Sequence, residues 1–236
     1  MTSNKIFPLI GFWLLMFVGS GFAVGQAQYV EHAGRPGSFP IVWRGGAATL
    51  LVDTNDFAGV ARAAGDLRGD IARVTGASPE IVCDPGRRET NAIIIGTLGR
   101  SRLIDRLVRE GRVDATPIAG KWESFFIQVV PKPFPEVANA LVICGSDKRG
   151  TIYGVYDLSE QIGVSPWYWW ADVTPEHQDA LFVKPGGCVQ GPPAVKYRGL
   201  FLNDEAPDLS HWITNRFGLV PTNANPPKRG TAGPRP

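Results

Sequence analysis

The sequence is poor in the two residue types that most often bind metals or form cross-links. It contains three cysteines and three histidines among 236 residues. At most one disulfide can form among Cys83, Cys144 and Cys188, so the chain is not a disulfide-stabilised scaffold. The spacings of these residues match no zinc-ligand pattern. We therefore expect no structural zinc site.

The sequence also lacks an excess of charge of one sign, and it lacks the common catalytic motifs. Its 24 Lys+Arg and 22 Asp+Glu residues give a net charge of +2. This balance argues against a strongly basic nucleic-acid-binding protein and against an acidic tail. The chain contains no GxSxG nucleophile motif, no HExxH zinc motif and no GxGxxG dinucleotide motif.

The N-terminus has the features of an export signal. Lys5 precedes an apolar run over residues 6–24, and the small residues Ala23, Gly25 and Ala27 are typical of a signal-peptidase site. The alternative is an uncleaved anchor, because the run approaches the length of a membrane span. We expect residues 1–27 to be a cleaved signal peptide. The mature protein is then secreted, or periplasmic in a Gram-negative bacterium, and meets a membrane only through its signal.

Residues 36–193 alternate between short β-rich runs and amphipathic helices. Periodicity predicts helices starting near Asn55, at 101–110 and just after Gly150, with Asn55 as an N-cap and Gly76 as a C-terminal stop. It predicts strands at 40–43, 49–52, 80–83, 92–95, 124–130 and 141–144. Two strands for each helix indicate an α/β domain with a mixed sheet and helices layered on it, rather than a purely parallel sheet.

The character of the chain changes after the double proline Pro192-Pro193, which marks a domain boundary. Residues 194–202 are predicted to form a strand, and a polar turn and a short helix at 209–217 follow it. Residues 219–236 show no periodicity and are expected to be an unstructured tail.

Tryptophans are concentrated at one place. Three of the seven, Trp167, Trp169 and Trp170, lie within four positions. Aromatic faces stack on the C–H faces of sugar rings, so the cluster is a candidate carbohydrate contact. The alternative, which the burial of aromatic rings favours, is a core between two domains.

Residues 145–151 (GSDKRGT) join a predicted strand to a predicted helix. Amide groups at a helix N-terminus beside Lys148 and Arg149 suit an anion such as a carboxylate or phosphate. The GxxxxGK[ST] spacing of a P-loop is absent. The alternative, which is the stronger on sequence alone, is a turn capped by Ser146 or Asp147.

A third candidate is the acidic cluster Asn203, Asp204 and Glu205, directly after an apolar strand. α/β barrels place active-site residues at the C-terminal ends of their strands. Adjacent Asp204 and Glu205 point to opposite faces of an extended strand, so they are not by themselves the carboxyl pair of a glycosidase. The alternative is an N-cap cluster for the following helix.

Four motifs in order along the chain resemble glycoside hydrolase family 115. They are KWESF at 121–125, GSDKRGTIYG at 145–154, SPWYWWAD at 165–172, and VKYRG at 195–199 followed by NDE at 203–205. The resemblance covers residues 39–227. Members of this family are xylan α-1,2-glucuronidases, which remove glucuronic acid or its 4-O-methyl ether from xylan.

The resemblance implies an architecture. Residues 36–193 would form an N-terminal α/β domain like hexosaminidase domain 2, and residues 194–218 the first βα unit of a catalytic (β/α)8 barrel. Members are several times longer, so this chain would be a truncated fragment whose main catalytic acid and base lie in the missing barrel. The fragment is expected to be inactive alone.

The resemblance also implies a site and a partner. Asn203 and Asp204 would line the uronic-acid pocket, with Lys148 and Arg149 on the N-terminal domain's side of the cleft. The complete set of substrate-binding candidates is Asn203, Asp204, Glu205, Lys148, Arg149 and Trp169. The partner would be glucuronoxylan or its oligosaccharides, with no nucleic acid and no cofactor, and the full-length enzyme could be a homodimer. The alternatives are a non-catalytic carbohydrate-binding module and a non-functional fragment.

Overall fold

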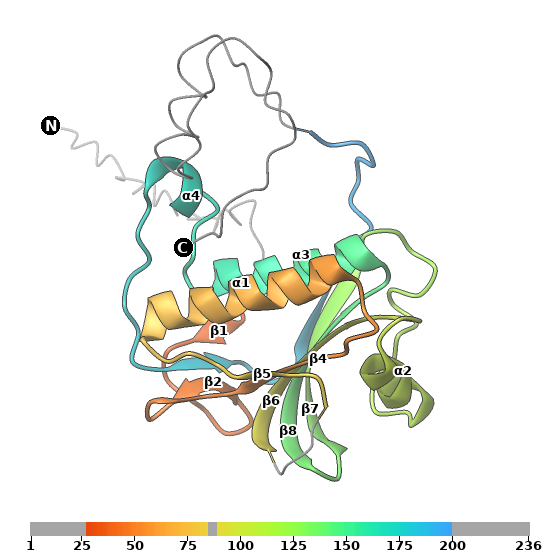
Figure 1. The fold of residues 1–236 in the computed structure, drawn as a ribbon, viewed down its shortest axis with the longest axis horizontal. Coiled ribbons are helices and arrows are strands. Elements are labelled where there is room, and N and C mark those ends of the chain that lie inside the picture. Colours follow the sequence, from red (N-terminus) through yellow and green to blue (C-terminus); the bar gives the residue numbers. More distant parts are fainter. Residues whose placement is uncertain (1–26, 85–88, 200–236) are drawn as a thin grey trace, which may run out of the picture. The chain divides into compact units, whose positions relative to one another are not determined.

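A computed structural model describes residues 27–84 and 89–199 of the chain (Figure 1). The chain divides into two compact units, residues 1–192 and 193–236. The first is described here; the second is described only as far as Gly199. Most of the predicted signal peptide, most of the predicted barrel strand and the predicted tail lie outside the described residues.

The first unit is built on a six-stranded mixed sheet. Its strands are β4 (Thr49–Val52), β5 (Ile81–Val82), β6 (Glu89–Thr97), β7 (Phe125–Phe134), β8 (Val137–Gly145) and β10 (Gly187–Gln190). The order across the sheet is β10-β7-β8-β6-β4-β5. The four strands β5, β4, β6 and β8 run parallel, and β7 is antiparallel to both of its neighbours. The predicted mixed sheet is thereby confirmed.

A second, smaller sheet was not predicted. It contains β1 (Val30–Glu31), β2 (Phe39–Trp43), β3 (Gly46–Ala47) and β9 (Leu181–Val183) in the order β1-β9-β2-β3, with every pair antiparallel. Only β2 had been expected from the sequence. The folded unit includes β1, which precedes Pro36. Strands of two or three residues are too short for alternation to become visible.

Helices cover both faces of the larger sheet (Figure 1). Helices α1 (Ala58–Thr75) and α3 (Lys148–Gln161) pack on one face, where Ile93 and Ile95 of β6 point. Helix α2 (Arg102–Arg109) packs on the other face, against Ile94. A short helix, α4, spans Tyr168–Ala171. No helix in the described ranges is long and apolar enough to cross a membrane.

The helix ends agree with the sequence prediction except at the starts of α1 and α3, and α3 begins at Lys148, before Gly150. Gly76 ends α1 in the left-handed conformation (φ +75°), as predicted, and Ser101, where the second helix was predicted to start, is the N-cap of α2. The N-cap of α1 is Phe57 and not Asn55. The Asn55 amide instead donates to the Asp53 carboxylate, 3.0 Å away, which holds residues 53–56 in a turn before the helix starts.

The three cysteines are free. Cys144 and Cys188 lie beside adjacent residues of β7, Phe126 and Ile127 respectively. Adjacent residues of a strand point to opposite faces of the sheet, so these two thiols belong to different cores. A disulfide between them is therefore geometrically excluded.

The N-terminal turn of α3 lies unusually close to the sheet. A Cβ atom added to Gly150 would lie 2.2 Å from the Ser124 carbonyl oxygen. At the next residue, the Thr151 hydroxyl is 2.7 Å from the buried Thr97 hydroxyl of β6. Gly150 is thus required, because only a residue without a side chain fits between the start of α3 and Ser124.

This contact predicts opposite effects for two glycine-to-alanine substitutions. Gly150→Ala is expected to lower the free energy of unfolding by about 1–3 kcal/mol, because the new methyl group meets backbone. Gly65→Ala, in the interior of α1, meets nothing within 4 Å and should stabilise by about 0.5–1 kcal/mol. Urea unfolding of both variants measures the difference. Equal midpoints would contradict the close packing.

Candidate functional site

The structure describes only some of the residues that the sequence predicted to bind substrate. Lys148 and Arg149 form the first turn of α3, at the end of the sheet where β8 ends. Trp169 belongs to α4, and its side chain lies outside what is described. Asn203, Asp204 and Glu205 lie outside the described residues. Only Lys148 and Arg149 can therefore be compared with their surroundings, and a role in substrate binding stays a prediction for all six residues.

The N-terminus of α3 is capped by the side-chain carboxylate of Asp147. Asp147 accepts a hydrogen bond from the Gly150 amide at 2.8 Å and another from the Glu123 amide at 2.9 Å. Ser146 bonds instead to the backbone of Ser124, donating to its carbonyl and accepting from its amide. Of the two interpretations of this segment, the capped turn describes the local geometry, with Asp147 as the cap.

Arg149 is held by an acidic residue that the sequence analysis did not single out. Its Nη1 atom lies 2.8 Å from Oε1 of Glu123, whose side chain is only 6% exposed. Glu123 has a positive φ of 48°, which is uncommon for a residue other than glycine. The hydrogen bond to Glu123 raises the pKa of Arg149. A glutamate immediately before a long apolar strand was the available signal.

A second buried carboxylate lies at the carboxyl end of β4. Oδ2 of Asp53 accepts from the Arg102 amide at 2.6 Å, and Oδ1 lies 2.9 Å from Arg102 Nη2. The hydrogen bonds from Arg102 hold the pKa of Asp53 below its usual range. Nearby, Asp56 accepts from the Thr97 amide at 2.6 Å. Asp53 thus joins the end of β4 to the start of α2, and Asp56 binds the last residue of β6.

Basic side chains gather at the same end of the sheet. The Arg100 guanidinium lies 4.7 Å from the ring centre of Phe57, and Lys148 Nζ lies 5.9 Å from it. Lys148, Arg149 and Arg100 are exposed. The acids Glu123 and Asp53 are buried, whereas their partners Arg149 and Arg102 are exposed, so basic groups face solvent here and suit an anionic ligand.

Two aromatic residues at the start of α4, Trp167 and Tyr168, differ in burial. Trp167 is 63% exposed. Tyr168 is partly buried against the larger core, and the Arg73 guanidinium lies 5.0 Å from its ring centre. The two interpretations of the segment, core and sugar contact, therefore apply to different residues: Tyr168 fits the first and Trp167 the second.

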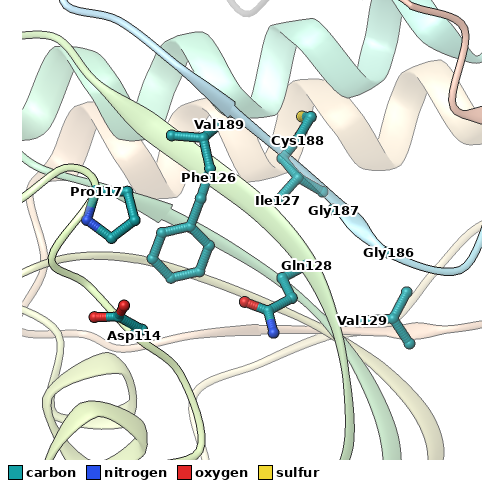
Figure 2. A pocket seen from close by; sticks show the side chains of 10 residues that line it. All are labelled: Asp114, Pro117, Phe126, Ile127, Gln128, Val129, Gly186, Gly187, Cys188 and Val189. Carbon is teal, nitrogen blue, oxygen red and sulfur yellow. The ribbon is translucent and has the colours of Figure 1, made fainter.

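A groove lies over β7 and β10, on the side of the sheet away from α1 and α3 (Figure 2). Its volume is about 370 Å³, and it had no counterpart in the sequence analysis. Figure 2 shows Asp114 and Pro117 facing Phe126 across it, whereas the Cys188 sulfur points toward the helices. The lining residues are Asp114, Pro117, Phe126, Ile127, Gln128, Val129, Gly186, Gly187, Cys188 and Val189.

The groove contains a single acidic side chain. The Asp114 carboxylate accepts from the Thr116 amide at 2.9 Å and from its hydroxyl, and these bonds lower the pKa of Asp114. Residues 27–84 and 89–199 contain no group of three His, Cys, Asp or Glu residues placed to hold a metal ion. The groove can thus accept hydrogen-bonding ligands but lacks a second carboxylate for acid–base chemistry.

Two comparisons relate the chain to known glycoside hydrolases. The family model for glycosyl hydrolase family 115 matches residues 190–227. A solved structure of a family GH115 4-O-methyl-alpha-glucuronidase, BtGH115A, described as having specificity for decorated arabinogalactans, is similar with a TM-score of 0.58 and 31% sequence identity. The match covers 72% of this chain and 20% of that structure. No curated protein sequence matches.

The chain is related to glycosyl hydrolase family 115. It spans about a fifth of the length of the glucuronidase structure that it matches. The mixed α/β domain is consistent with the N-terminal domain of that family. The expected first unit of a barrel falls mainly on residues outside the described ranges.

The cap of α3 predicts a stability difference between two substitutions at one position. Asp147→Ala removes the acceptor for the Gly150 and Glu123 amides and should lower the free energy of unfolding by about 1–2 kcal/mol. Asp147→Asn keeps one of the two acceptor oxygens and should lose about half of that. Urea unfolding at pH 7 measures both. An asparagine variant as unstable as the alanine variant would contradict the capping role.

The Asp53–Arg102 pair predicts a pH dependence. The folded-state pKa of Asp53 lies below its unfolded value of about 3.9, so its contribution is present above about pH 4 and is lost as pH falls through the folded pKa. Asp53→Asn should cost about 1–2 kcal/mol at pH 7 and flatten the acid limb of the stability profile. Glu176→Gln, at an exposed carboxylate, is the control. Parallel acid limbs for wild type and Asp53→Asn would contradict the assignment.

Proposed function

We propose that the chain is the N-terminal part of an exported xylan α-1,2-glucuronidase, which removes glucuronic acid or its 4-O-methyl ether from glucuronoxylan. The observation that carries this proposal is the 31% identity over 72% of the chain to a GH115 4-O-methyl-alpha-glucuronidase. The family match at residues 190–227 supports a catalytic unit that starts after the described domain. Because that relative is described as specific for decorated arabinogalactans, these are the alternative substrate class.

In this proposal the described domain binds or orients substrate and does not cleave it. Glycoside hydrolysis needs two carboxyl groups on either side of the scissile bond. The groove over β7 and β10 offers only Asp114. Glu123 and Asp147 are engaged in bonds within the domain. Lys148 and Arg149, together with Asn203, Asp204 and Glu205, are the residues proposed to meet the uronic acid, and the 236-residue chain alone is proposed to be inactive.

A second candidate is a carbohydrate-binding module without catalysis. The observation that favours it is the 63% exposure of Trp167 beside α4. An exposed indole offers a flat apolar face for a sugar ring, and its burial in a complex would be favourable.

The gene region that follows the codon for Pro227 tests the first proposal. We expect further (β/α) barrel strands to be encoded there, in the same frame or another. The polypeptide that includes them should release glucuronic acid from glucuronoxylan, measured by chromatography, whereas the 236-residue chain should release none. A downstream region without such strands, or a complete polypeptide that releases no uronic acid from either glucuronoxylan or decorated arabinogalactan, would overturn the proposal.

Trp167→Ala tests the second candidate, the binding module, in the 236-residue chain. If the chain is a binding module, titration with glucuronoxylan should change its tryptophan fluorescence, and the alanine variant should bind at least about tenfold more weakly. The control is Tyr156→Phe. Tyr156 is exposed on α3, and the substitution keeps its aromatic ring. No fluorescence change at millimolar ligand would exclude the binding module.

A further inference from the structure

The tip of the β2–β3 hairpin presents an exposed tryptophan beside an arginine. Trp43 pairs in register with Gly46, so the turn between the strands consists of Arg44 and Gly45 alone. Trp43 is 50% exposed. The Arg44 guanidinium carbon lies 5.3 Å from the centre of the indole ring. This pair lies on the smaller sheet and is separate from Lys148 and Arg149.

The backbone of this turn does not favour arginine. Arg44 and Gly45 have positive φ values of 52° and 76°. Two-residue hairpin turns with positive φ at both positions favour asparagine, aspartate or glycine at the first of them. A long side chain in the left-handed region is strained relative to these residues. The turn therefore gives no structural reason for an arginine at position 44.

The indole packs against Phe182 and is half exposed. Its ring centre lies 5.4 Å from that of Phe182, a residue of β9 that is 7% exposed. A Cβ atom added to Gly45 would meet nothing within 4 Å, and one added to Gly46 would meet only the Trp43 carbonyl oxygen at 3.5 Å. The contact with Phe182 thus holds the indole in place, while half of its surface stays accessible to a ligand.

The guanidinium is available to a carboxylate. Arg35, between β1 and β2, is paired with Glu31 at 3.2 Å. Across residues 27–84 and 89–199, by contrast, no carboxylate lies within ion-pair distance of Arg44. To meet an anionic ligand, the guanidinium only has to leave the ring face, and it breaks no ion pair in doing so.

We propose that Trp43 and Arg44 form a surface binding site for an acidic sugar residue of a polysaccharide. The indole stacks on the C–H face of the sugar ring, and the guanidinium donates two hydrogen bonds to the carboxylate of the uronic acid. The choice of a uronic-acid polysaccharide rests on the function proposed above. The site would hold the polymer at a distance from the reacting bond and takes no part in cleavage.

Binding of the full chain to two forms of one polymer tests this site. The polymers are glucuronoxylan and the same xylan with its uronic carboxyl groups reduced to alcohols, and the dissociation constant is measured by affinity electrophoresis. The wild-type chain should bind glucuronoxylan about tenfold more tightly than the reduced polymer. Trp43→Ala should weaken binding to both polymers, because stacking does not depend on the carboxylate.

Arg44→Asn is the decisive variant. Asparagine suits the left-handed turn, so this variant should unfold at a higher temperature than wild type and yet bind the two polymers equally. Arg62→Gln removes one positive charge from the exposed surface of α1 and should leave both affinities unchanged. An Arg44→Asn variant that keeps the preference for glucuronoxylan, or a wild-type chain without that preference, overturns the proposal. Neither result touches the hydrolysis assay, so failure of the proposed function remains distinguishable.

Discussion

The described domain depends on the close contact between the start of α3 and the ends of β7 and β8. Gly150 brings the helix backbone to within a distance that no side chain would allow, and Asp147 binds amides of both the helix and the segment before β7. Buried amides need such partners, because an unpaired one costs about as much as a lost hydrogen bond. One short segment thus fixes the helix, two strands and the buried carboxylate of Glu123.

This contact also determines which charges remain available for function. Asp53, Glu123 and Asp147 are engaged with arginines or backbone amides, so their negative charge is balanced inside the domain. Exposed basic side chains at the same end of the sheet include Arg100, Lys148 and Arg149. A near-neutral chain can therefore present a positive surface where the strands end, and net charge alone does not reveal it.

The sequence predicted the helices and strands whose apolar residues show a clear periodicity, and it missed the shortest strands. Six of the ten strands and all three longer helices carry enough apolar residues for their periodicity to be visible. Strands β1, β3, β9 and β10 have two to four residues, and pairing with distant segments stabilises them. The same limit applies to the site. The cap at Asp147 is local and was among the predicted alternatives, whereas the Glu123–Arg149 bond joins residues 26 positions apart.

Stability explains the identity of the buried polar residues, but it does not explain every residue on the surface. Asp147 and Glu123 could not be changed without leaving backbone groups or a charge unpaired, so their identity is explained by stability. Arg44 has no such explanation, because the hairpin would be at least as stable with asparagine at its tip. A residue that its own backbone disfavours, on a surface that needs no cover, is better explained by contact with another molecule. For a chain related to glycoside hydrolases, a charged polysaccharide is the ligand whose chemistry suits an indole next to a guanidinium.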